Sequence, residues 1–187
     1  MDDNELMPNE MLMPLLTEIQ QDGEQALAHL EELLPLYERD PRLHFLRGSV
    51  LAGLERYVPA RAAMQLAVDI APDYAVARFQ LGFLALTSGD PNAARATWQP
   101  LLNLPQDDPL NLFVQGLNHL MVDEFEAAIA LLEQGIALNT TIPPMNKDMA
   151  LIVREAREKL DTHAPEEEVE SGAHFLLRQY GFKDTKH

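Results

Sequence analysis

The sequence predicts an all-α protein made of repeated pairs of helices, and three observations lead to that prediction. Residues of the same kind recur every 34 residues through the middle of the chain. Turn-forming residues divide each repeat into two helical stretches. Proline follows an aspartate where several helices are expected to begin, because the aspartate side chain can accept from free backbone N–H groups and proline suits the first helical turn.

The period is visible in four columns of residues that stay in phase. A glycine inside a helix costs about 1 kcal/mol relative to alanine. Three such glycines in register therefore predict a packing need, with a second helix lying close to each first helix. The columns are Gly48, Gly82 and Gly116; Ala60, Ala94 and Ala128; Phe45, Phe79 and Phe113; and Met64, Trp98 and Leu132.

The repeats are expected to run in order from about residue 41. The first opens at Pro41, which Asp40 can cap. The second has helices over 74–86 and 91–102, with a turn over 87–90. The third begins at Pro109 and has its second helix over 125–138.

The regions on either side of the repeats are less regular. A degenerate unit precedes them, with a first helix over about 9–20 in which Pro14 should cause a kink or a restart. A loop is expected over 139–146. Apolar residues over 148–160 have the spacing of one helical face, which predicts one more amphipathic helix. An acidic stretch over 161–172 looks like a linker, and a short apolar segment over 173–182 follows it.

These columns resemble the tetratricopeptide repeat (TPR), which has glycine at its eighth position and alanine at its twentieth. The first unit matches it best, with Gly48, Ala60, Ala67 and Pro72 at the family's positions. The resemblance covers about residues 10–140 and implies a right-handed solenoid of helix-turn-helix repeats with a C-terminal capping helix and a short tail. It gives three regions: an N-terminal helical segment over 1–22, a solenoid with its cap over 23–160, and a tail over 161–187.

The resemblance also implies which residues face a partner. In TPR proteins the first helices line a concave surface, and their second, fifth, sixth and ninth positions point into it. Four phenylalanines at such positions, at about 150–250 Å² each, would if fully exposed exceed the largest apolar patch of a typical monomer, roughly 300–600 Å². A phenylalanine column at the repeat period is also compatible with packing between helices, and Trp98 is interpreted as core. The groove prediction comprises Phe45, Ser49, Phe79, Gln80, Phe83, Phe113 and Leu117.

One TPR subgroup holds the C-terminal carboxylate of chaperones with a clamp of lysine, asparagine and arginine. The clamp residues are missing from this sequence, so binding of such acidic tails is not expected. The corresponding positions hold Phe45, Ser49, Gln80, Leu110 and Val114.

The net charge, the residue content and the motifs that are missing exclude several classes of function. The net charge of −16 disfavours nucleic acid and anionic membrane surfaces as partners. The chain has no cysteine, no apolar run long enough to span a bilayer and no secretory signal, so a cytoplasmic location is expected. Phosphate-binding loops and catalytic motifs are missing, and the six histidines lack metal-ligand spacing. We therefore expect no enzyme activity, no cofactor and no metal.

The sequence thus predicts a protein–protein interaction scaffold that binds a peptide or helix with apolar anchors in a mostly apolar groove. Two alternatives remain open. Acidic three-TPR proteins serve as bacterial secretion chaperones, and this chain is similar to them in size and charge. A homodimer formed through the groove, or through the methionine-rich start (Met1, Met7, Met11 and Met13), is the other alternative.

Overall fold

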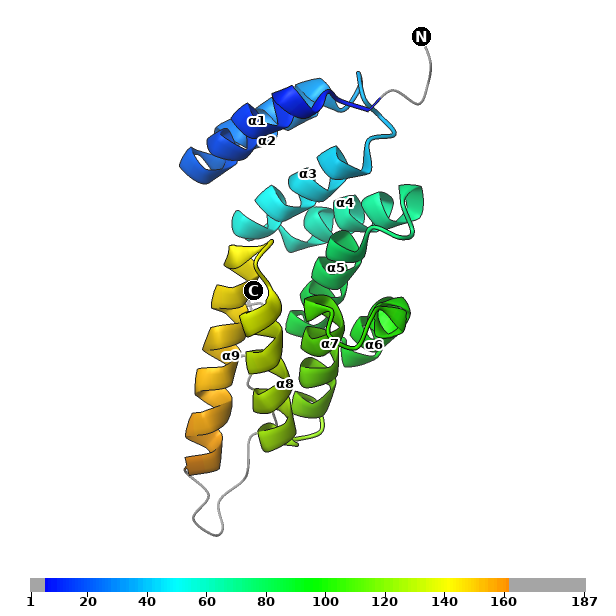
Figure 1. Ribbon diagram of the computed structural model, residues 1–187. Helices are drawn as coiled ribbons and strands as arrows, with labels where there is room; N and C mark the ends of the chain where they lie inside the picture. The colour runs from blue at the N-terminus through cyan, green and yellow to red at the C-terminus, as the bar shows by residue number, and fades with distance from the viewer. Residues whose placement is uncertain (1–5, 162–187) are drawn as a thin grey trace, which may run out of the picture. The chain divides into compact units, whose positions relative to one another are not determined.

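The computed structural model describes residues 6–161, and every regular element in that part of the chain is helical, as predicted (Figure 1). The whole apolar segment predicted over 173–182 lies outside the described residues, as do Met1 and all of the acidic linker except Asp161. The chain divides between Leu81 and Gly82 into two compact units. The elements are α1 (Asn9–Gln21), α2 (Gly23–Leu33), α3 (Pro41–Gly53), α4 (Tyr57–Ile70), α5 (Ala75–Thr87), α6 (Pro91–Trp98), the 3-10 helix η1 (Gln99–Asn103), α7 (Pro109–Leu120), α8 (Phe125–Leu138) and α9 (Pro143–Asp161).

Four helices begin after an aspartate whose side chain accepts hydrogen bonds from the first-turn N–H groups. Asp40 caps α3 and was predicted to do so, and Pro41, Pro91 and Pro109 each occupy a first helical position. These short-range signals explain why the sequence located the helix starts so well. The four caps are Asp22 on α2, Asp40 on α3, Asp90 on α6 and Asp108 on α7.

Close approach at the periodic glycines joins the two helices of a repeat. A Cβ placed on Gly48 would lie 2.6 Å from Cγ of Met64, on the facing helix α4. In the second unit, a Cβ on Gly116 would lie 2.8 Å from Cγ of Leu132 on α8. Contacts this short leave no room for a methyl group, so the packing need predicted from the glycine column is confirmed.

Two helix boundaries differ from the sequence prediction by more than one residue. The helix predicted over 91–102 is α-helical only to Trp98 and continues as η1, where Pro100 has no N–H to donate. The last helix begins at Pro143 instead of residue 148, because Pro143 and Pro144 lie in its first turn, where proline is tolerated. Asn139 ends the preceding helix and accepts from the Ile142 N–H at 3.1 Å.

Of the kink or restart expected at Pro14, the restart does not occur. Helix α1 is assigned without a break from Asn9 to Gln21. Pro14 removes one intrahelical hydrogen bond near the start of the helix, where Glu10 is exposed and its carbonyl group can bond to water. A proline close to a solvent-exposed helix start therefore costs less than one in the middle.

A buried polar cluster fixes the start of α1 against α3 in the first unit. The Asp40 side chain is fully buried and accepts from the Met7 N–H at 2.9 Å. Arg42 donates to Asp40 Oδ1 from Nε at 2.9 Å and to the Met7 carbonyl from Nη2 at 2.5 Å. Burial raises the pKa of Asp40, but the hydrogen bonds from Arg42 and Met7 outweigh it and hold the pKa below its usual value.

Candidate functional site

The predicted partner-binding positions differ sharply in exposure between the two units. On α3 all four positions are half-buried, so this helix presents a continuous accessible strip, which we call the α3 face: Arg42, Phe45, Leu46 and Ser49. Phe45 is the aromatic residue of this face. The Phe45 ring lies edge-on to the Tyr74 ring, with centroids 5.4 Å apart and an interplanar angle of 62°. An aromatic pair of this kind offers a partner a rigid apolar surface.

The polar atoms at the α3 face are engaged within the protein. The Ser49 hydroxyl donates to the Phe45 carbonyl at 2.9 Å, so its proton is already used and only its oxygen is left to accept a hydrogen bond. Arg42 is held by Asp40, Met7 and Asn9. These bonds orient Arg42 and leave fewer of its guanidinium N–H groups available to an incoming anion.

Tyr74 completes this surface at the start of α5. Burial raises the pKa of Tyr74, Arg42 acts to lower it, and Asp40 acts to raise it further. The phenol therefore remains neutral through the physiological range and can donate one hydrogen bond to a partner. Gln80, one of the predicted site residues on α5, is half-buried in the same unit, whereas Phe79 beside it is completely buried.

In the second unit the predicted groove residues are interior. Phe113 and Leu117 on α7 have no exposed surface, and Phe83 retains 9%. A Cβ placed on Gly135 of α8 would lie 2.6 Å from ring carbons of Phe113, so this ring packs against the facing helix. The packing interpretation of the phenylalanine column therefore describes Phe113.

A sequence signal for this burial exists at Gly135. The family has alanine near this position, and here a glycine stands in the last turn of the second helix, α8. Such a glycine indicates that a bulky side chain lies directly against the backbone. Phe45 does not have this arrangement, since Ala67 occupies the equivalent place in the first unit.

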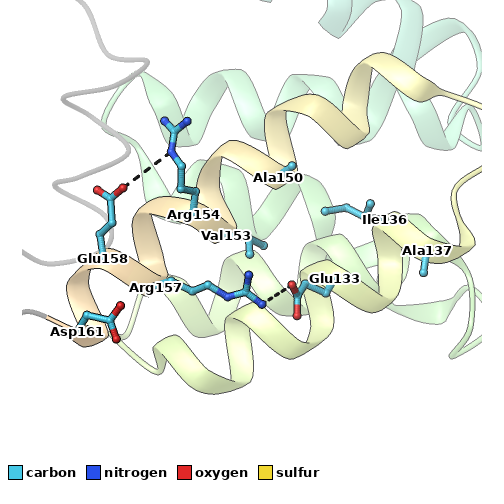
Figure 2. Close-up of a pocket in the computed structure, with 9 residues that line it drawn as sticks. All are labelled: Glu133, Ile136, Ala137, Ala150, Val153, Arg154, Arg157, Glu158 and Asp161. Carbon is cyan, nitrogen blue, oxygen red and sulfur yellow. Dashed lines mark hydrogen bonds and ion pairs between the residues drawn. The ribbon is translucent and has the colours of Figure 1, made fainter.

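A groove that the sequence did not predict lies between α8 and α9, with a volume of about 510 Å³ (Figure 2). Apolar side chains of both helices form its floor, and charged side chains form its rim. Arg157 donates from Nη2 to Glu133 Oε1 at 2.5 Å across the groove. Along α9, Arg154 Nε lies 4.0 Å from Glu158 Oε1. We call it the α8–α9 groove; its lining residues are Glu133, Ile136, Ala137, Ala150, Val153, Arg154, Arg157, Glu158 and Asp161.

This groove escaped sequence reasoning because it needs two helices to form. The helical spacing over 148–160 places Met149, Ile152 and Ala156 on one face, and all three are buried. Arg154 and Arg157 lie on the opposite, charged face of the same spacing, which by itself indicates a solvated surface. Only the packing of α8 alongside α9 makes a concavity beside them.

Among residues 6–161, no three histidine, aspartate or glutamate side chains gather where they would hold a metal ion. No helix in the described part of the chain is both long and apolar enough to cross a membrane.

Comparisons with known proteins agree with this architecture. The tetratricopeptide repeat family matches residues 20–75. The Hsp70-Hsp90 organizing protein of Triticum aestivum is 32% identical over 107 residues, which is 57% of this chain but only 17% of that protein. This chain therefore corresponds to a small part of that relative.

Two solved structures share the fold at low sequence identity. MamA 41-end from Desulfovibrio magneticus RS-1 has a TM-score of 0.57 at 16% identity, over 89% of this chain and 86% of the other. The MamA RS-1 ArsTM double mutant has a TM-score of 0.56 at 16% identity, over 93% and 92% of the two chains. At this identity the similarity concerns the arrangement of helices.

Proposed function

We propose that this chain, which belongs to the tetratricopeptide-repeat family, is a protein–protein interaction scaffold that binds an apolar peptide or helix on its α3 face. The observation that carries the proposal is the accessible edge-on pair of Phe45 and Tyr74. Phe45, Ser49 and Gln80 are the proposed contacts among the predicted groove residues. Phe79 is completely buried in the same unit, so it is not among the proposed contacts.

The proposed partner has aliphatic or aromatic anchors and few acidic groups. An aromatic pair at a surface gives contact area at a small entropic cost, and a few such anchors dominate the affinity of most interfaces. The net charge of −16 favours a neutral or basic partner. The acidic C-terminal tails that the chaperone clamp binds are a poor fit, because Phe45, Ser49 and Gln80 carry no positive charge.

Capture from a native lysate with the intact chain and two variants tests the proposal. Phe45→Arg places a charge in the aromatic pair and should abolish capture of the partner, with the helical circular dichroism retained. Val58→Arg is the matched control, since Val58 is 79% exposed on α4 in the same unit. A protein that all three baits capture equally would remove the α3 face from the proposed function.

Self-association is the second candidate, and one observation favours it. On one side of helix α1, 67% of Met13 and 37% of Leu16 are exposed three residues apart, and Met11 is 41% exposed elsewhere on the helix. Flexible methionine side chains suit an adaptable interface. Sedimentation of the chain over a range of concentrations, beside Met13→Lys, distinguishes a dimer from a monomer that awaits another partner.

A further inference from the structure

Helix α9 occupies the position of the first helix of a further repeat. Ala150 shows this, because it lies at the repeat position that glycine holds in the preceding units. Ala150 lies 34 residues after Gly116, in series with Gly48 and Gly82. Each of those glycines is buried, and each lies against the large residue 16 positions further along, as Gly116 lies against Leu132. Ala150 is exposed and lines the α8–α9 groove. Within residues 6–161, α9 therefore has no second helix of its own.

The groove has the surface that such a helix would cover. Ile136 and Ala137 from α8 and Ala150 and Val153 from α9 form an apolar floor (Figure 2). The rim is charged, with Arg154 63% exposed and Arg157 56% exposed at the side chain. An occupant therefore needs an apolar face for the floor, with acidic groups nearby for the two arginines.

The sequence that follows α9 has both properties. Residues 166–170 contain four glutamates, and residues 173–182 carry Ala173, Leu176, Leu177 and Tyr180 at the i, i+3, i+4, i+7 spacing of one helical face. Asp161, the last residue of α9, itself lines the groove, so the following chain begins at its edge.

The length of the intervening stretch is sufficient for this arrangement. Residues 162–172 can extend to about 36 Å, whereas the 19 residues of α9 are about 28 Å long. The chain can therefore turn back and place residues 173–182 anywhere along α9. The segment is covalently tied to the groove, which gives it an effective concentration in the millimolar range, roughly, against any competing molecule.

We propose that residues 173–182 bind in the α8–α9 groove of the same chain as an amphipathic helix, and so supply the missing second helix of the α9 repeat. Leu176, Leu177 and Tyr180 cover the apolar floor, and the glutamates of the preceding stretch face Arg154 and Arg157. The segment thereby covers the end of the repeat array. This inference is independent of the proposed function.

Engineered disulfides in the full chain test the proposal, because the protein has no cysteine of its own. Ala150→Cys combined with Leu177→Cys should form an intramolecular disulfide on mild oxidation at micromolar concentration. Leu102→Cys with Leu177→Cys is the matched control, since Leu102 is 37% exposed in the same unit and does not line the groove. The first pair should react at least roughly tenfold faster, in proportion to its effective concentration. Equal rates would overturn the proposal.

A mixture of two single-cysteine variants distinguishes binding of the segment within one chain from binding to a second copy. Isotopically labelled Ala150→Cys and unlabelled Leu177→Cys, oxidised together, should remain largely uncrosslinked. A mixed disulfide that forms as fast as the intramolecular one would assign the groove to a neighbouring copy and overturn the proposal as stated.

Hydrogen exchange of α9 gives a second readout on the full chain without cysteines. Leu177→Asp should raise the exchange rate of the amides around Ala150 and Val153 several-fold, because the covering helix is lost. Phe175→Asp adds the same charge on the opposite side of the helical face and should leave that rate unchanged. If both variants leave the α9 amides as in the parent, the segment does not cover the groove.

Discussion

The carboxylate of Asp40 accepts a hydrogen bond from the backbone N–H of Met7, at 2.9 Å and across 33 residues of sequence. The same side chain caps α3 through the Arg42 N–H, also at 2.9 Å. One buried aspartate therefore joins a helix cap to the start of the chain's first helix.

Replacement of this aspartate should be far more costly than the loss of an ordinary cap. Asp40→Ala removes the cap and leaves the Met7 N–H without its acceptor and Arg42 without its carboxylate. We expect a loss of about 2–4 kcal/mol in the free energy of unfolding, measured by urea denaturation. Asp22→Ala, at an exposed cap on α2, is the control and should cost about 1 kcal/mol. Equal losses would show that the links to Met7 and Arg42 add nothing.

The lowered pKa of Asp40 predicts acid sensitivity of the first unit. The folded protein holds this carboxylate ionised at a pH where the unfolded chain, with a pKa near 3.8, takes up a proton. The stabilisation is therefore complete above pH 3.8 and is lost as the pH falls through the lower, folded pKa. Asp40→Asn should flatten the dependence of stability on pH below about 4, which denaturation at a series of pH values measures.

Asp148 should behave in the opposite way. Burial raises the pKa of Asp148, so the ionised carboxylate at neutral pH disfavours the folded state. Its unfavourable contribution is relieved as the pH falls through the raised, folded pKa toward the unfolded value. Asp148→Asn should therefore increase the thermal midpoint at pH 7 and have little effect at acidic pH. A lower midpoint at pH 7 would show that the carboxylate has a stabilising partner.

Two glycines offer a direct test of close helix packing. Gly116→Ala introduces a Cβ that would lie 2.8 Å from Leu132 and 3.2 Å from the Ala128 carbonyl oxygen. Overpacking of this kind should cost about 1–3 kcal/mol, more than the gain of about 1 kcal/mol in helix propensity. A Cβ on Gly53 meets nothing within 4 Å, so Gly53→Ala should be neutral or stabilising. Thermal denaturation of both variants measures the difference.

Two phenylalanines from the same sequence column should give opposite results. Phe113 is fully buried, and Phe113→Ala should cost about 3–5 kcal/mol in unfolding free energy. Phe45 is half-buried, so Phe45→Ala should cost clearly less than Phe113→Ala and reduce partner binding instead. Similar losses of stability would mean that Phe45 also belongs to the core.

The sequence by itself determined the helices, their pairing and most of their starts. Caps such as Asp40 and Asp108 act within one turn, and the glycine column records a contact between neighbouring helices. Both are short-range constraints, so they leave a pattern that can be read along the chain. The helix end at Trp98 and the helix start at Pro143 were less predictable. A proline can lie in the first turn of a helix or interrupt one, and the sequence alone does not distinguish these cases.

Only the tertiary structure decided which residues of a column are accessible. Phe45, Phe79 and Phe113 occupy one repeat position, yet Phe45 is half-buried and the other two are interior. Exposure depends on everything that packs around a side chain, including Gly135 opposite Phe113, and a repeat position does not encode those neighbours. The α8–α9 groove arises for the same reason, because a concavity belongs to the contact between two helices and to neither sequence alone.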